Sequence, residues 1–174
     1  HLAVRNTAGL FDVSHMGEIL IDGPEAASFI NYVSTNDIAS IADRDAQYSL
    51  LCNEKGGILD DIIIYRKNIK SFMLVVNAIN KQKILNWLNF NCNHKVVIND
   101  VSDKLGLLAL QGPNSCSIIK KVLNIDLYNL PYYSFCFESF ENTEIMISRT
   151  GYTGELGYEI YVENKKIVKL WNIL

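Results

Sequence analysis

The chain has 174 residues, of which 49% are hydrophobic and 20% are charged. These values are ordinary for a globular protein and exclude a disordered or fibrous chain. Sixteen basic and nineteen acidic side chains leave a formal charge of −3, so no positive excess indicates a nucleic acid or an anionic membrane as partner. The length predicts one domain, or two small ones that share a core.

No apolar run reaches the roughly 18 residues that a membrane-spanning helix needs, and residues 1–6 lack the apolar centre of a signal peptide. The cysteines show no CxxC spacing and no partnered histidines, which favours reduced, packed thiols in a cytosolic-type compartment over a disulfide framework or a zinc site. They are Cys52, Cys92, Cys116 and Cys136. We therefore predict no metal site.

Strands are predicted where β-branched and aromatic residues alternate with polar ones or form short apolar runs. In chain order these segments are 17–22, 46–52, 58–66, 70–77, 95–101, 105–111, 134–140, 143–149 and 157–162. Apolar stripes at helical spacing predict helices over 24–33, 79–91, 113–123 and 165–174. Pro24 and Pro113 each follow a glycine and are assigned to the first helical position, where a missing N–H costs nothing.

Several predicted strands are neighbours in sequence, and helices intervene only at intervals. This order favours an α+β fold, with antiparallel sheets that carry helices packed on one face. The asparagine-rich stretch Asn86–Asn93 is a candidate boundary. The chain begins at His1, and its last helical stripe stops at Leu174 without a Gly or Asn cap, so we expect a fragment truncated at both ends.

Two adjacent acids interrupt an apolar strand in the segment 53–65, which reads NEKGGILDDIIIY. Side chains alternate between the faces of a strand, so Asp60 and Asp61 are expected to point to opposite sides and not to form a two-carboxylate acid/base pair. An acid that faced inward here would lose its hydration and would need a partner. From this segment alone, the favoured interpretation is an edge strand with a bulge that turns both acids to water.

A second segment, 148–159, reads SRTGYTGELGYE and places a glycine at every third position of a loop. Such a loop lets the backbone approach a flat ligand while Tyr152 packs on it, although a plain hairpin turn has the same composition. Glu159 lies in the apolar strand that follows and is either outward and solvated or inward and functional. No helix follows the loop, so it is not a GxGxxG phosphate site.

Two other polar segments are interpreted as structural. Residues 11–17 read FDVSHMG, in which Asp12, Ser14 and His15 are close neighbours, whereas a catalytic triad is assembled from separated segments. Residues 111–114 read QGPN and open a helix, where capping is favoured over anion binding.

Four motifs in a fixed order carry a resemblance to a known family. They are GLFDVSHMG at 9–17, NEKGGILDD at 53–61, LQGP at 110–113 and SRTGYTGE at 148–155. Together they resemble the aminomethyltransferase family, the T-protein of the glycine cleavage system, over essentially the whole chain. The resemblance implies a partial tetrahydrofolate-binding aminomethyltransferase domain over residues 1–174, without the start of the family's chain and its C-terminal β domain.

The resemblance implies a folate-dependent transferase. The T-protein takes an aminomethyl group from the lipoyl arm of H-protein, releases ammonia and hands the methylene to tetrahydrofolate. The expected co-substrate is therefore tetrahydrofolate and the expected protein partner is a lipoylated H-protein, with neither a nucleic acid nor a membrane as partner. The expected compartment is the cytoplasm in a bacterium or the mitochondrial matrix in a eukaryote.

The resemblance also assigns roles to individual residues. Asp61 matches the acid that faces the folate and is linked to catalysis, which reverses the preference for a solvated acid, and Glu159 matches the acid that hydrogen-bonds the pterin. We hypothesise that Asp61 is ionised and acts by positioning and electrostatics, not as a covalent nucleophile. The other matched folate-pocket positions are Tyr152, Asn77, Tyr48 and Met16.

Alternative functions stay open at this stage. The first is another tetrahydrofolate-dependent methyl or one-carbon transferase, such as a demethylase, which needs the same pocket. The iron–sulfur cluster-assembly relatives are disfavoured because they typically carry a Lys-Gly-Cys-Tyr-type motif and lack the aspartate pair. The second is a non-catalytic α+β binding module whose acids face water and whose glycines only turn the chain.

Overall fold

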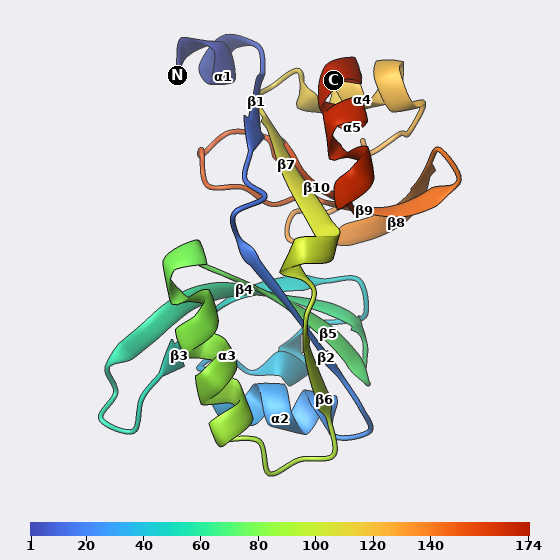
Figure 1. Cartoon of the computed structure of the whole chain (residues 1–174). Coiled ribbons are helices and arrows are strands. Elements are labelled where there is room, and N and C mark those ends of the chain that lie inside the picture. Colours follow the sequence, from blue (N-terminus) through green and yellow to red (C-terminus); the bar gives the residue numbers. More distant parts are fainter. The chain divides into compact units, whose positions relative to one another are not determined.

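The computed structural model describes residues 1–174 and separates them into two compact units, each with its own sheet and helices (Figure 1). Unit 1 consists of His1–Ser14 together with Asp103–Leu174, and unit 2 is His15–Ser102. The boundary expected within Asn86–Asn93 is wrong, because that stretch lies inside unit 2 and contains the end of a helix.

Unit 2 is built on a five-stranded antiparallel sheet in the order β3-β4-β5-β2-β6. Its strands are β2 Gly17–Asp22, β3 Ala46–Cys52, β4 Ile58–Asn68, β5 Ser71–Val76 and β6 Val97–Asp100. Its helices are α2 Ala26–Val33 and α3 Lys81–Phe90, with short 3₁₀ turns η1 Ile38–Ser40 and η2 Ala78–Asn80.

The core of unit 2 lies between one face of this sheet and the two helices. Alternate strand residues such as Ile62 and Ile64 point toward the helices and pack with Phe29 of α2 and Ile84 of α3. Each helix therefore buries a single apolar stripe. The opposite face of the sheet carries Asp61 and Ile63 of β4, and this face positions the candidate site.

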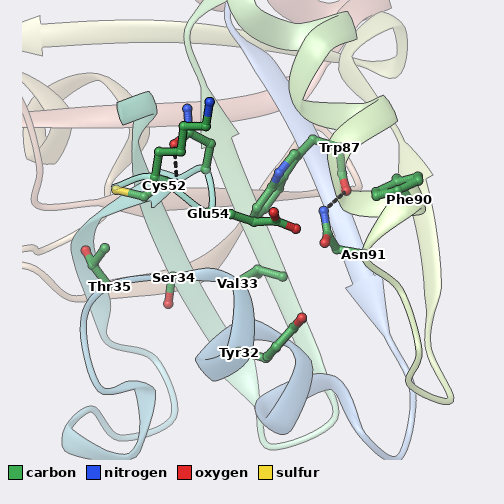
Figure 2. Close-up of a pocket in the computed structure, with 11 residues that line it drawn as sticks. Tyr32, Val33, Ser34, Thr35, Cys52, Glu54, Trp87, Phe90 and Asn91 are labelled. Carbon is green, nitrogen blue, oxygen red and sulfur yellow. Dashed lines mark hydrogen bonds between the residues drawn. The ribbon is translucent and has the colours of Figure 1, made fainter. Parts of the chain in front are cut away.

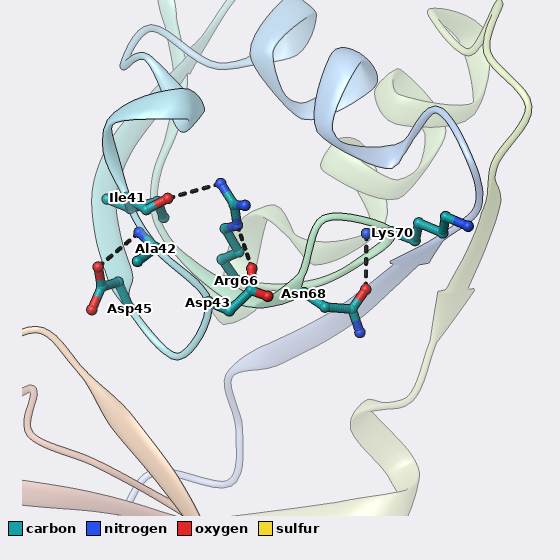
Figure 3. A network of polar contacts seen from close by, with 7 residues as sticks. All are labelled: Ile41, Ala42, Asp43, Asp45, Arg66, Asn68 and Lys70. Atoms are coloured by element: carbon teal, nitrogen blue, oxygen red, sulfur yellow. Dashed lines mark hydrogen bonds and ion pairs between the residues drawn. The ribbon is translucent and has the colours of Figure 1, made fainter.

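A polar network ties the loop before β3 to β4 (Figure 3). The Arg66 guanidinium donates from Nε to Asp43 Oδ1 at 2.8 Å and from Nη1 to the carbonyl of Ile41 at 2.8 Å. Asp45 accepts a hydrogen bond from the backbone N–H of Ala42 at 2.8 Å. These contacts fix the loop that delivers the chain into β3.

Unit 1 repeats the plan with a five-stranded antiparallel sheet in the order β1-β7-β10-β9-β8. The strands are β1 Gly9–Asp12, β7 Leu105–Gln111, β8 Phe135–Phe140, β9 Thr143–Ser148 and β10 Gly157–Glu163. The helical segments are α1 Leu2–Asn6, α4 Ser115–Leu123 and α5 Ile167–Ile173, with a 3₁₀ turn η4 Asn164–Lys166 before α5. The 3₁₀ turn η3 Ser102–Lys104, which precedes β7, begins at the last residue of unit 2. Its core packs Ile119 and Leu170 against Leu108, Leu110 and Ile160.

The α+β fold with antiparallel sheets and helices packed on one face is confirmed in both units. The prolines are a correction: α2 begins at Ala26 and α4 at Ser115, so Pro24 and Pro113 lie in the turns that precede the helices and not at the first helical position. Asn114 precedes α4 but makes no side-chain cap, so the capping expected at residues 111–114 is absent.

The cysteines, the turn at Ser14 and the helix lengths complete the description of the fold. All four cysteines are half-buried, and none of them forms a disulfide. Ser14 donates from its hydroxyl to Asp12 at 2.6 Å and accepts from the backbone N–H of Leu107 at 3.0 Å, so it serves a turn and not a triad. None of the helices is both long and apolar enough to cross a membrane.

Candidate functional site

Three of the predicted residues meet in unit 2. Tyr48 of β3 donates from its hydroxyl to Asp61 Oδ2 at 3.3 Å, and Asn77, just after β5, donates from Nδ2 to Asp61 Oδ1 at 2.8 Å. Asp61 itself lies on β4, between the other two strands, and is exposed. The three strands therefore present one exposed carboxylate whose two oxygens are each held by a neutral donor.

Sheet register explains why these side chains share a face. Tyr48 pairs with Ile63 across β3 and β4, and Asp61 is two residues before Ile63 on the same strand. Gly17 of β2 pairs with Val76 of β5. Met16 comes just before Gly17 in the chain, and Asn77 comes just after Val76. Met16, which is half-buried, thus lies at the same end of the sheet, although no hydrogen bond joins it to the cluster.

Asp60 behaves differently from its neighbour. It is only 3% exposed, and its carboxylate accepts from the backbone N–H of Asn77 at 2.9 Å, from Asn77 Nδ2 at 2.9 Å and from Asn80 Nδ2 at 2.6 Å. The expectation that an edge strand turns both acids to water is wrong, because β4 has strands on both sides and Asp60 is buried. The register does shift between Leu51 and Cys52, so a bulge is present at this end of the sheet.

Two pKa values near the cluster are raised. Loss of hydration, the charge of Asp61 and the hydrogen bond to it raise the pKa of the Tyr48 hydroxyl above 10.0, so this phenol remains a donor at neutral pH. Glu18 of β2 is fully buried, and neither of its carboxylate oxygens has a hydrogen-bond partner. Burial raises the pKa of Glu18 from 4.5 to about 8, against the opposing charge of Lys81.

Unit 1 holds the other predicted acid. Glu159 lies on β10 opposite Ala109 and Ser148, on the face that is not covered by the helices. It is half-buried and accepts a hydrogen bond from the Thr150 hydroxyl, which in turn lies 2.9 Å from Ser148 Oγ. Glu159 is therefore neither fully solvated nor part of the core.

The glycine-rich loop of unit 1 is packed around a buried amide. A Cβ at Gly151 would lie 2.1 Å from Gln111 Oε1, and one at Gly157 would lie 2.2 Å from the same atom, so only glycine fits at either position. Gln111 donates to the carbonyls of Thr150 and Tyr158, both at 3.3 Å. The two glycines let the loop close on Gln111.

A hollow of about 300 Å³ borders this loop and is lined mainly by loop residues. Its aromatic wall is Tyr132, whereas Tyr152 is 74% exposed and does not line it. The role assigned to Tyr152 stays a prediction.

A hollow in unit 2 is lined by none of the predicted site residues (Figure 2). It has a volume of about 580 Å³ and runs between the last turns of α2 and α3 and the β3–β4 turn. Its aromatic residues are Tyr32, Trp87 and Phe90, the last of them 85% exposed. Asn91 donates to the carbonyl of Trp87 at 2.9 Å and closes one end.

Sequence reasoning missed several supporting residues. Gln111 could have been noticed from the glycines of the loop. Pairing of β7 with β10 brings Gly157 opposite Gln111, and Gly151 also lies against the Gln111 side chain. Thr150 lies within the quoted loop motif. Asn80 carried no signal, because its contact with Asp60 depends on where α3 starts.

Comparison with known proteins gives a consistent result. The profile of the GCVT N-terminal domain matches residues 1–174. Among curated proteins, the aminomethyltransferase of Halothermothrix orenii is 45% identical over 100% of this chain and 49% of its own length. The aminomethyltransferase of Thermotoga maritima is 43% identical over 99% of this chain and 48% of its own length. The chain thus spans about half the length of these relatives.

Solved structures agree. The glycine cleavage system aminomethyltransferase T of Bartonella henselae superposes with a TM-score of 0.90 at 35% identity, over 99% of this chain and 46% of that protein. A heterotetrameric sarcosine oxidase from Corynebacterium sp. U-96 gives a TM-score of 0.69 at 14% identity, over 92% of this chain and 78% of that chain, and shares the fold alone. With a family profile matched from end to end and a close structural relative, the chain belongs to the GCVT N-terminal domain family.

Proposed function

We propose that this chain supplies folate-binding and catalytic residues to an aminomethyltransferase of the glycine cleavage system. In that reaction the bond between the lipoyl sulfur and the aminomethyl carbon breaks, nitrogen leaves as ammonia, and the carbon becomes the methylene of 5,10-methylenetetrahydrofolate. The lipoylated H-protein is the donor partner and tetrahydrofolate is the acceptor. The relatives at 43–45% identity are named aminomethyltransferases, which supports this assignment.

The observation that carries the proposal is the exposed carboxylate of Asp61 between two fixed donors. Tyr48 and Asn77 hold its two oxygens from neighbouring strands, so the side chain need not reorganise when charge develops next to it. Positive charge develops on the one-carbon unit as the sulfur and nitrogen leave. An ionised Asp61 stabilises that charge electrostatically, and no covalent bond to the protein is required.

Glu159 suits the binding of the pterin ring. A pterin presents several N–H donors along one edge, and a carboxylate is an acceptor that binds two of them in charge-assisted hydrogen bonds. The hydrogen bond from Thr150 fixes one oxygen of Glu159 and so orients the group. We assign Glu159 to pterin binding and Asp61 to the transfer step, while Met16 and Tyr152 remain proposed folate contacts.

The deciding experiment compares turnover with affinity in the intact protein that carries this sequence. Asp61→Ala is expected to lower kcat far more than it weakens tetrahydrofolate binding, measured by tryptophan or tyrosine fluorescence, because the carboxylate acts on the developing charge. Asp22→Ala is the matched control, since Asp22 also lies on a strand of unit 2 and accepts a hydrogen bond, from Ser71 at 2.6 Å. Equal losses in kcat and affinity would reassign Asp61 to plain binding.

The same protein separates the alternatives. Ammonia release from an aminomethylated lipoyl protein supports the proposed reaction, whereas methyl transfer from small donors without ammonia release supports a demethylase. A fluorescence signal that shows no saturable change at high micromolar tetrahydrofolate supports a non-catalytic module.

A further inference from the structure

The buried acid of the aspartate pair is connected to the exposed one. Asp60 Oδ1 lies 2.9 Å from Asn77 Nδ2, and the same nitrogen lies 2.8 Å from Asp61 Oδ1 and 3.2 Å from the carbonyl of Asp61. One amide nitrogen with two hydrogens thus serves three acceptors. Strand alternation sends the two aspartates to opposite faces, and the Asn77 amide joins them around the end of the sheet.

Asp60 determines which way the Asn77 amide points. Its Oδ2 accepts the backbone N–H of Asn77, and its Oδ1 accepts the side-chain N–H of the same residue, both at 2.9 Å. With the amide turned over, the Asn77 carbonyl oxygen would face acceptors on both aspartates, with no hydrogen to share. Both aspartates therefore favour the orientation that donates, and the buried carboxylate of Asp60 adds a second contact, to the Asn77 backbone N–H, that holds Asn77 in place.

Asn80 holds Asp60 in turn. Its Nδ2 donates to Asp60 Oδ1 at 2.6 Å. Asn80 precedes α3, and Asn77 precedes η2, yet neither side chain caps its helix. Asparagine is among the strongest N-cap residues, so both positions forgo local helix stabilisation and direct their amides to the aspartates.

We propose that Asp60 is a positioning residue for the transfer step, and that Asn80 supports it. Together they hold the Asn77 amide in the single orientation that donates to Asp61, and this fixes the rotamer of the Asp61 carboxylate. The inference rests on the proposed function, because it assumes that Asp61 acts in turnover. Asp60 touches no reacting atom and works only through Asn77.

The first test is kinetic and uses the intact protein. Asp60→Asn places an N–H donor against the donors of Asn77 and Asn80 and so disrupts the orientation. We expect kcat to fall about tenfold or more while KM for tetrahydrofolate changes by less than about threefold. Asn80→Ala, which removes one of three donors to Asp60, should shift kcat in the same direction by less. Comparable losses in kcat and affinity would overturn the proposal.

Matched controls separate positioning from general damage. Asp22→Asn alters another hydrogen-bonded strand carboxylate of unit 2, and Asn89→Ala removes an α3 asparagine whose amide donates to Leu85 at 2.8 Å. Both should retain the kinetic constants of the parent protein. Urea unfolding of every variant shows which of them are folded at the assay temperature, and Asn80→Ala keeps the test available if Asp60→Asn does not fold.

A double-variant cycle distinguishes this inference from the proposed function itself. If Asp60 acts only through Asp61, adding Asp60→Asn to Asp61→Ala should cause no further loss of kcat. If Asp61→Ala alone keeps full turnover, the proposed role of Asp61 fails. If Asp61→Ala lowers kcat and the double variant is lower still, by the full factor that Asp60→Asn shows alone, only the positioning inference fails.

A spectroscopic measurement does not depend on turnover. The side-chain amide of Asn77 gives a pair of NMR signals, which we expect to move in Asp60→Asn and Asn80→Ala and to stay in place in both controls. Unchanged Asn77 signals in Asp60→Asn would show that Asp60 does not orient this amide and would overturn the inference.

Discussion

The buried Glu18 predicts that the stability of this protein falls as pH rises through neutrality. Glu18 is fully buried on β2, and its carboxylate oxygens lack hydrogen-bond partners. Loss of hydration is the main reason that its pKa rises from 4.5 to about 8; the charge of Lys81 opposes the rise and that of Asp100 adds to it. The folded protein therefore keeps this carboxyl group protonated at a pH where the unfolded chain releases the proton.

The sign and size of the effect follow from proton linkage. Between pH 4.5 and about 8 the folded state binds one proton more than the unfolded state, so the free energy of unfolding decreases as pH increases. Each pH unit within this window costs about 1.4 kcal/mol, which gives roughly 3 kcal/mol between pH 5 and pH 7. Above the folded-state pKa both states are ionised and the loss levels off.

Glu18→Gln tests this reasoning because glutamine keeps the shape of the protonated acid and cannot ionise. Urea unfolding of the parent chain and the variant at pH 5, 6, 7, 8 and 9 should give free-energy curves that diverge from pH 5 to 8, with the variant gaining relative to the parent. Glu54→Gln, which removes an exposed carboxylate from unit 2, is the control. Parallel curves for Glu18→Gln and the parent would refute the buried, protonated acid.

Three further changes have defined outcomes. Gly157→Ala drives a methyl group into the buried Gln111 amide, where Cβ would lie 2.2 Å from Oε1; we expect a loss of about 2–3 kcal/mol in urea unfolding, and an unchanged midpoint would contradict the packing of this loop. Tyr48→Phe removes one of the two hydrogen bonds that hold the Asp61 carboxylate and leaves the one from Asn77, so kcat should fall less than about tenfold with KM nearly constant; a loss as large as that of Asp61→Ala would show that the phenol does more than hold the carboxylate. Arg66→Ala breaks the ties to the loop before β3 and should cost about 1–2 kcal/mol of stability, whereas an unchanged urea midpoint would show that the loop does not depend on them.

Local patterns predicted most of the elements because they depend on neighbouring residues. The segments 17–22, 46–52 and 105–111 coincide with β2, β3 and β7. The four-residue strand Gly9–Asp12 was missed, since GLFD offers no clear alternation and the strand forms only by pairing with β7, about 100 residues away. The helix Leu2–Asn6 is a little over one turn and is too short for a periodic signal.

Strand patterns predicted the exposure of Asp61 but not its connection to Asp60, and the difference has a physical reason. The role of Asp61 rests on its motif and stays a prediction, while its exposure agrees with strand alternation. The same alternation suggested that Asp60 and Asp61 do not interact, because they point to opposite faces of β4. Alternation along one strand takes no account of Asn77, which follows another strand and whose amide contacts both aspartates at the end of the sheet. Long-range hydrogen bonds of this kind depend on register and on where α3 begins, and neither can be obtained from a single sequence.

The face that carries Asp61 also carries the buried acid. Glu18 pairs with Val75, Val75 with Ile63 and Ile63 with Tyr48, so Glu18 lies on the same side of the sheet as Asp61, two strands and one row away from it. The charged neighbours that act on Glu18 are Lys81 and Asp100, and burial keeps Glu18 neutral at pH 7. The cost in stability above pH 5 thus arises on the same face of the sheet that carries Asp61, because the carboxyl group buried there can ionise only against its loss of hydration.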